Sequence, residues 1–272
     1  MSWLVVARKD FEDSIRSRWL QGLTALFVGL VALIAVVSLR LSTGGETIST
    51  NALLGAGFMG LLSGTLVPLI ALVIAYSAVT GERESGSLKL LLSLPHSRAD
   101  VVFGKVAGRS AALSTAIIVG FVVPAVILAA GPLSLDIVSY VGYTLLVSLL
   151  VSVFVAIAVG WSAAAPSQRI ALGGAIGLYF LFVPFWDIIQ FPLQIAISSL
   201  PEWVPVSGTA ISNALFLLNP ASAFQGLTNA LLQGQLFAGE TAGLQLSALS
   251  MLLFWLLAAP LAGLFVFQRR DL

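Results

Sequence analysis

The chain has 272 residues, of which 58% are apolar and only 9% are charged. A globular domain normally carries about 25% charged residues, so too few polar side chains remain to cover a soluble surface. Thirteen basic and twelve acidic residues nearly cancel, which leaves no basic stripe for nucleic acid. The lack of cysteine and the single histidine, His96, exclude disulfides, thiolate zinc sites and sites with two imidazoles. These numbers predict an integral membrane protein.

Residues 1–18 predict an amphipathic helix in the membrane interface. Four apolar residues share one face of the helical wheel: Leu4, Ala7, Phe11 and Ile15. A secretory signal peptide does not fit, because acidic residues interrupt its basic region and the apolar run that follows is too long. A solvated, frayed leader remains the alternative.

Six long uncharged runs predict six transmembrane helices. A charge at the bilayer centre costs roughly 2.5 to 3.5 kcal/mol, so the spans lie between the charged residues. The runs are apolar on every face, whereas the strands of a membrane barrel would alternate. The predicted spans are residues 19–39, 53–79, 110–130, 137–161, 170–190 and 247–267.

The basic residues predict the orientation. Six spans place twelve of the thirteen basic residues on one side, with Arg40 alone on the other. Because basic residues stay on the cytoplasmic side, both termini are expected in the cytoplasm. A seventh helix within residues 191–246 would put the C-terminus outside, so this proline-rich stretch is expected to form an outer loop with short helices.

The loop 80–109 is the one long cytoplasmic connection, and it holds eight of the 25 charged residues. It is expected to begin with a charged turn between Gly81 and Gly86, which permit tight backbone geometry. Ser87 is expected to cap a short helix, and Ser97 a second helix that continues into the third span. The loop either merely connects two spans or docks a soluble partner. Docking is favoured because the predicted spans nearly lack the ionisable groups that drive secondary transport.

Two pairs of glycines predict close helix contacts in the membrane: Gly60 with Gly64, and Gly173 with Gly177. The contacts are expected within the chain, with a seam between two subunits as the alternative. Asp187, near the outer end of the fifth span, is expected to be an interfacial residue.

The stretch GERESGSLKLLLSLPHSRADVVFGK, residues 81–105, resembles the signature of ABC type-2 transporter permeases. The pair Asn219-Pro220 and the closing FQRRD at 267–271 also resemble this family, most closely the branch that includes the permease of nitrous-oxide-reductase maturation. Lys89 is a departure, because many relatives have an acid there.

The resemblance implies an all-α membrane protein with six transmembrane helices, a cytoplasmic coupling helix between spans two and three, and an outer re-entrant segment between spans five and six. It implies a permease subunit of an exporter in a prokaryotic cell membrane, in contact with membrane lipid. The partners would be a second permease, as a homodimer or heterodimer, and a separate ATP-binding-cassette ATPase subunit. That ATPase would bind ATP and magnesium, and this chain would carry no catalytic, cofactor or metal site.

In this family the coupling helix is seated in a cleft of the ATPase. The residues that match the motif, and are therefore the candidate contacts, are Glu82, Arg83, Glu84, Gly86, Leu90, Leu91 and Pro95. Two alternatives remain. The chain could be a membrane anchor that recruits an ATPase without transport, or an intramembrane enzyme, although the sequence offers no cluster of acids, histidines or serine with a base for such chemistry.

Overall fold

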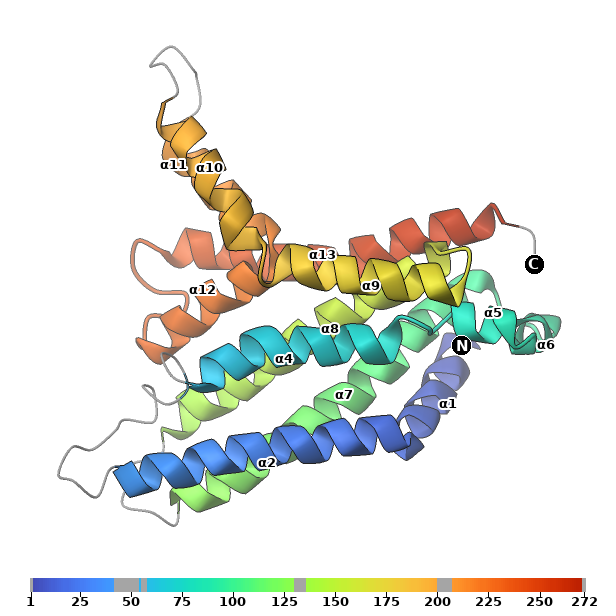
Figure 1. The fold of residues 1–272 in the computed structure, drawn as a ribbon, viewed down its shortest axis with the longest axis horizontal. Coiled ribbons are helices and arrows are strands. Elements are labelled where there is room, and N and C mark those ends of the chain that lie inside the picture. The colour runs from blue at the N-terminus through green and yellow to red at the C-terminus, as the bar shows by residue number, and fades with distance from the viewer. Residues whose placement is uncertain (1, 42–53, 55–57, 130–135, 200–206, 271–272) are drawn as a thin grey trace.

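The computed structural model describes residues 2–41, 54, 58–129, 136–199 and 207–270, and every regular element in these ranges is a helix. The long helices run side by side in an elongated bundle (Figure 1). The all-α prediction is therefore confirmed for the described part of the chain. The predicted start of the second span and residues 200–206 of the predicted outer loop lie outside these ranges.

The helices follow the chain in simple order. They are α1 (Ser2–Arg16), α2 (Arg18–Leu41), α4 (Phe58–Ala75), α5 (Thr80–Glu84), α6 (Ser87–Ser93), α7 (Arg98–Ala129), α8 (Ile137–Ala164), α9 (Gln168–Phe182), α10 (Trp186–Ser198), α11 (Gly208–Leu218), α12 (Pro220–Leu232) and α13 (Ala242–Gln268). Among the described residues, five helical stretches are long and apolar enough to cross a membrane: α2, α4 continued into α5, α7, α8 and α13. The bent pair of α9 and α10 makes a sixth if it counts as one span.

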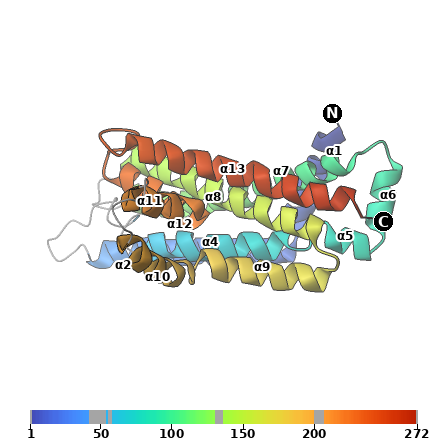
Figure 2. The same ribbon diagram turned by 90° about the horizontal axis from the view of Figure 1, so that it is seen from above.

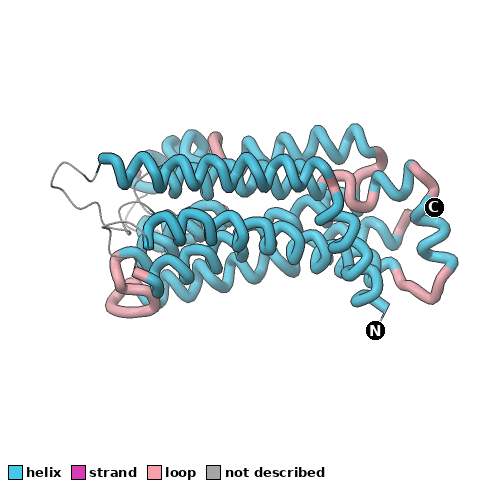
Figure 3. Tube along the Cα trace, turned by 90° about the horizontal axis from the view of Figure 1, so that it is seen from below, coloured by secondary structure: helices cyan, strands magenta, loops and turns pink. Residues whose placement is uncertain are grey.

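The two ends of the bundle differ. α1, α5, α6 and the end of α13 lie together at one end, here called the termini end (Figure 2). α10, α11 and α12 lie toward the opposite end, here called the hairpin end. Figure 3 shows most of the connections between helices at these two ends.

The predicted fifth span is broken at Pro184, where α9 ends and the helix axis bends by 49°. Proline has no N–H, so the carbonyl four residues earlier loses its helical partner. The Phe185 N–H bonds that carbonyl, Phe180 O, at 2.9 Å instead. The neighbouring carbonyl of Phe182 accepts a bond of 2.7 Å from the buried Asn219 amide. The carbonyls of Phe180 and Phe182 are thus both hydrogen-bonded at the break, one by the local backbone and the other by a side chain of a distant segment.

α8 is the central helix of the bundle. Residues 153–160 are all buried, as expected for a helix that is apolar on every face. Gly160 and Gly263 bring α8 and α13 into direct backbone contact, because a Cβ atom on either glycine would overlap the backbone of the other helix. Small residues allow such close approach between membrane helices.

The predicted N-terminal helix is present, and it also packs against the rest of the chain. Val6, Ala7 and Asp10 are buried against α7, whereas Leu4 and Ile15 of the predicted interfacial face are exposed. The close packing depends on α7. Two of its glycines, residues 104 and 108, admit the backbone of α1 so closely that a Cβ on the second would lie 2.5 Å from the Ala7 carbonyl oxygen.

The predicted glycine contacts within the chain are wrong where the structure can test them. A Cβ atom added to Gly64, Gly173 or Gly177 would meet nothing within 4 Å. The α8–α9 contact uses Gly174 instead, against which the indole of Trp161 lies directly. A seam with a second subunit stays open as the alternative for the three uncovered glycines.

Candidate functional site

The predicted charged turn forms a short helix, α5, followed by a sharp reversal at Gly86. Gly86 has φ = 77°, in the left-handed region that glycine favours, and it caps α6. Ser87 is therefore inside α6, so the prediction that it caps the helix is wrong by one residue. Gly81 has no positive φ, and a Cβ there would make an ordinary 3.6 Å contact with Ser77. Of the two glycines predicted to permit tight backbone geometry, only Gly86 is therefore in a conformation that favours glycine.

The second predicted cap is confirmed. The Ser97 N–H donates to Asp100 Oδ2 at 2.9 Å, and the Asp100 N–H donates to Ser97 Oγ at 3.1 Å. This reciprocal pair is a capping box, which satisfies two N–H groups at the start of α7. α7 then continues without interruption into the predicted third span.

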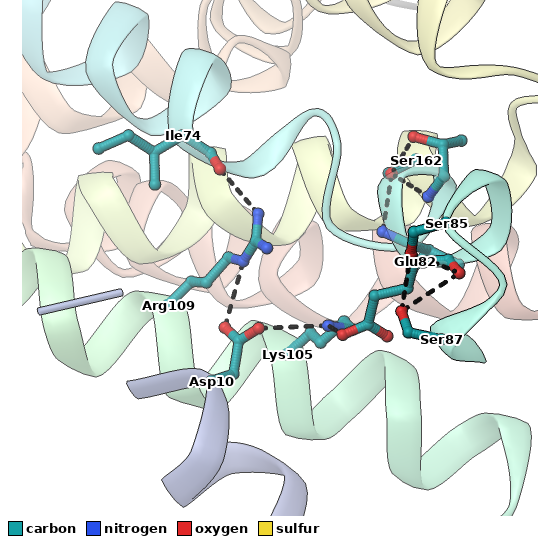
Figure 4. A network of polar contacts seen from close by, with 10 residues as sticks. Asp10, Ile74, Glu82, Ser85, Ser87, Lys105, Arg109 and Ser162 are labelled. Carbon is teal, nitrogen blue, oxygen red and sulfur yellow. Dashed lines mark hydrogen bonds and ion pairs between the residues drawn. The ribbon is translucent and has the colours of Figure 1, made fainter. Parts of the chain in front are cut away.

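Glu82 is the first of three successive charges on α5 that bind different neighbours, and Figure 4 shows it together with Lys105, Asp10 and Arg109. Lys105 Nζ, on α7, donates to Glu82 Oε1 at 2.6 Å and to Asp10 Oδ1 of α1 at 3.2 Å. Arg109 donates to Asp10 Oδ2 at 3.1 Å and to the Ile74 carbonyl of α4 at 2.7 Å. The two cations balance the two carboxylates, as buried charges require. The network joins α1, α4, α5 and α7.

Arg83 turns to the other side of α5. Its guanidinium donates to the carbonyls of Ala165 at 2.9 Å and Ala163 at 3.4 Å, at the C-terminal end of α8, where a cation complements the helix dipole. Its Cζ atom also lies 5.5 Å from the ring centre of Phe267 on α13. Beside it, Ser162 Oγ accepts bonds from the first N–H groups of α5.

Glu84 contacts a third part of the bundle, the start of α9. Its Oε1 accepts a 2.7 Å hydrogen bond from the Gln168 N–H, in the first turn of α9, where a negative charge is favourable. The charges of residues 82, 83 and 84 thus reach α7 with α1, α8 with α13, and α9, respectively. We call these three residues and their partners the charged hub.

Arg98 fastens the start of α7 to the end of α13. Its Nη1 donates to the Phe267 and Arg270 carbonyls, and its Cζ atom lies 5.0 Å from the centre of the Phe267 ring. The aromatic ring therefore has the guanidiniums of both Arg98 and Arg83 close to it. Cation–π contacts of this kind hold an arginine in place without an acid.

The predicted contact residues divide into two groups. The charges of Glu82 and Arg83 are engaged inside the chain, and Leu91 is half-buried against the core. Gly86 forms the turn. Glu84, Leu90 and Pro95 are exposed, and Leu90 keeps 72% of its surface free. The surface open to a partner is therefore Glu84 together with the tip formed by α6 and the residues after it.

Sequence reasoning missed Lys105 and Asp10. Lys105 has only 2% of its surface exposed, although it lies within the predicted cytoplasmic connection 80–109. A signal was available: Lys105 and Arg109 are four residues apart, and each follows one of the glycines at 104 and 108. Two cations on one face of a helix, each beside a small residue, predict that a second helix packs closely there and supplies an acidic side chain.

The described part of the chain contains no group of three or more histidine, aspartate or glutamate side chains that could hold a metal ion. The hub charges are used in hydrogen bonds and ion pairs between helices. The arrangement suits the mechanical linking of an exposed tip to a helical bundle.

Comparison with known proteins agrees with this architecture. Residues 4–272 match the model of the family described as ABC-2 family transporter protein. The chain is 30% identical over 280 residues to the "Probable ABC transporter permease protein NosY" of Stutzerimonas stutzeri, covering 97% of both chains. It is also 30% identical over 227 residues to the protein of the same name from Pseudomonas aeruginosa, covering 81% of this chain and 78% of the relative.

Proposed function

The chain belongs to the ABC-2 family of transporter proteins, and we propose that it is the permease of an exporter driven by a separate ATP-binding-cassette ATPase. The family makes it a multi-pass membrane subunit of an ABC transporter, consistent with its five or six apolar spans. ATP and magnesium belong to the ATPase, and this chain supplies the membrane path without catalysing a reaction.

The exposed tip at α6 is the observation that carries the proposal. Leu90 and Leu94 are exposed there, whereas Leu88 on the same short helix is fully buried and anchors it. Exposed Lys89 lies beside Leu90. A short apolar helix with a charged neighbour fits a groove on a soluble protein, because apolar side chains supply affinity and charges select the partner.

The charge bias favours a cytoplasmic location for the termini end. Twelve of thirteen basic residues belong to segments that six spans place on this side, and basic loops stay in the cytoplasm. The tip at α6 is at the same end, so it faces the compartment that contains ATP.

The second permease is proposed to cover the surfaces of α4 and α9 around three glycines that this chain leaves open. Gly64 on α4 and Gly173 and Gly177 on α9 have no atom of this chain within 4 Å of an added Cβ. Small residues on two helices of one chain suit close contact with another permease. The partner is an identical or a related chain.

Co-purification with the cognate ATPase subunit tests the proposal. Leu90→Asp puts a charge in the apolar contact and is expected to abolish co-purification. Lys9→Gln lowers the net charge by the same amount on the exposed face of α1 and is expected to leave co-purification unchanged. Equal recovery of the ATPase with both variants, each inserted in the membrane at the wild-type level, would contradict docking at α6.

A further inference from the structure

We infer that Glu82, on α5, transmits motion and does not itself bind the ATPase: it carries the movement of α6 to α1 through Lys105. This inference rests on the proposed function, since it concerns how an ATPase bound at α6 acts on the membrane bundle. It assigns a positioning role to a motif charge that the sequence favoured as a partner contact.

The Glu82 carboxylate is turned into the chain. Oε1 accepts the 2.6 Å bond from Lys105, and Oε2 is buried as well, without a hydrogen-bond partner among the described residues. A partner protein in the cytoplasm therefore finds Oε1 already paired with Lys105 and Oε2 buried. Exposed residues that it can reach are Glu84 and Ser85 before the turn, and Lys89 and Leu90 on α6.

The Lys105 side chain is placed to transmit a displacement of α5 to α1. Its ammonium group lies between Glu82 Oε1 at 2.6 Å and Asp10 Oδ1 at 3.2 Å, so it joins the docking segment to the N-terminal helix (Figure 4). A lysine ammonium has three donors on a flexible stem, whereas an arginine fork is rigid. The lysine can thus keep both carboxylates as α5 shifts.

α1 is able to respond as one piece. It rests on the glycines at 104 and 108 of α7, and no side chain from either position interlocks with it. Its main polar tether is Asp10, which is bound by both Lys105 and Arg109. Trp3, Leu4 and Val5 on its other side are exposed. A pull on Asp10 therefore moves a helix that carries exposed apolar residues in its first turn.

Stability alone does not explain why Lys105 is joined to Glu82 and Asp10 by ion pairs. Burying an ion pair costs desolvation energy, and apolar side chains of similar volume often stabilise a fold as well or better. What an ionic link adds is an attraction that persists over a range of distances, because Coulomb energy falls only with the inverse of separation. Such a link suits two parts that move together.

Hydrogen exchange of the complex with its ATPase subunit, in phospholipid nanodiscs, tests the inference. Addition of magnesium and a non-hydrolysable ATP analogue is expected to change amide exchange in α6 and in α1 of the wild-type chain. Glu82→Gln is expected to keep ATPase binding and the α6 response, and to lose the α1 response. Glu12→Gln removes an acid from the exposed Arg8 pair on α1 and is expected to behave as wild type.

A second variant covers the case in which Glu82→Gln fails to fold. Glu82→Gln with Lys105→Gln removes the bridge but leaves Asp10 paired with Arg109 at 3.1 Å, so no buried charge is left alone. The same selective loss in α1 is expected. The inference is overturned if α1 still responds, if α1 does not respond in the wild type, or if the folded variants no longer bind the ATPase. Wild-type binding and the α6 response report separately on the proposed function.

Discussion

The termini end and the hairpin end of the bundle are fastened by different chemistry. At the termini end, full charges join the helices, as in the contacts of Lys105 with Asp10 and Glu82. At the hairpin end, neutral groups do so: Asn219 donates to the Phe182 carbonyl at 2.7 Å, and the Trp255 indole to the Leu218 carbonyl at 2.9 Å.

The difference fits the inference that the termini end receives a displacement. A neutral hydrogen bond weakens steeply when its distance or angle changes, so it fixes one geometry. An ion pair loses energy gradually with distance. The hairpin end is thus held in place by bonds of fixed geometry, whereas the termini end, where the exposed α6 lies, is held by links that survive movement.

The largest effect is expected from Lys105→Met, which leaves the partly buried Glu82 carboxylate without a cation and the buried Asp10 carboxylate with Arg109 alone. Breaking a buried ion pair by removing one partner costs about 3 to 5 kcal/mol. Thermal unfolding in detergent should show a large loss of stability. Lys9→Met, at an exposed position on α1, is the control and should change little. Similar unfolding temperatures for the two variants would show that the charges do not hold this end.

Gly108→Val is expected to have the next largest effect, because its side chain would push α1 away from α7. A Cβ at this position lies 2.5 Å from the Ala7 carbonyl oxygen. Overpacking of this kind costs typically about 1 to 3 kcal/mol. Amide exchange in residues 2–16 should rise. Gly177→Val, where a Cβ meets nothing within 4 Å, should leave that exchange unchanged; a rise in both variants would contradict the specific contact.

Trp255→Phe is expected to loosen the hairpin end modestly. The wild-type Trp255 ring centre lies 5.4 Å from that of Phe182, and the smaller phenyl can still pack there, but the N–H bond to the Leu218 carbonyl is lost. A hydrogen bond contributes about 0.5 to 1.5 kcal/mol, so a small drop in the unfolding temperature should accompany faster exchange in α11. Trp19→Phe, on a largely exposed side chain, serves as the control. Unchanged exchange in α11 would show that this bond does not fasten it.

The smallest effect is expected from Asp136, the N-cap of α8 at the hairpin end. The Ser139 hydroxyl and the N–H groups of residues 138 and 139 hold the pKa of this carboxyl below its ordinary value. Because the folded pKa is the lower one, its stabilisation is present above the ordinary pKa and disappears as the pH falls through the folded value. Unfolding of wild type and Asp136→Asn should therefore differ slightly near pH 7 and converge in acid; a constant difference would contradict this.

The long helices could be predicted because membrane burial forbids charge, which leaves the spans visible as gaps. Local signals also gave the Ser97 cap and the turn at Gly86. The break at Pro184 could have been predicted from proline chemistry, but its closure by Asn219 depends on a residue 37 positions away. No local pattern encodes such a contact.

The hub could be predicted only in part, for the same reason. The sequence favoured Glu82 and Arg83 as contacts with a partner, and only their distant partners reveal that both are engaged within the chain. Asp10 and Lys105 are 95 residues apart. Their meeting depends on α1 docking against the glycines of α7, which neither segment predicts alone.

Cross-linking at Leu90 tests the central claim most directly. The chain has no cysteine, so Leu90→Cys creates a single site for a thiol-reactive photo-cross-linker in membranes that also contain the ATPase subunit. The account predicts a cross-linked product of permease and ATPase from Leu90→Cys and none from Lys9→Cys. Absence of that product at Leu90, with the ATPase bound to the membrane complex, would contradict docking at α6.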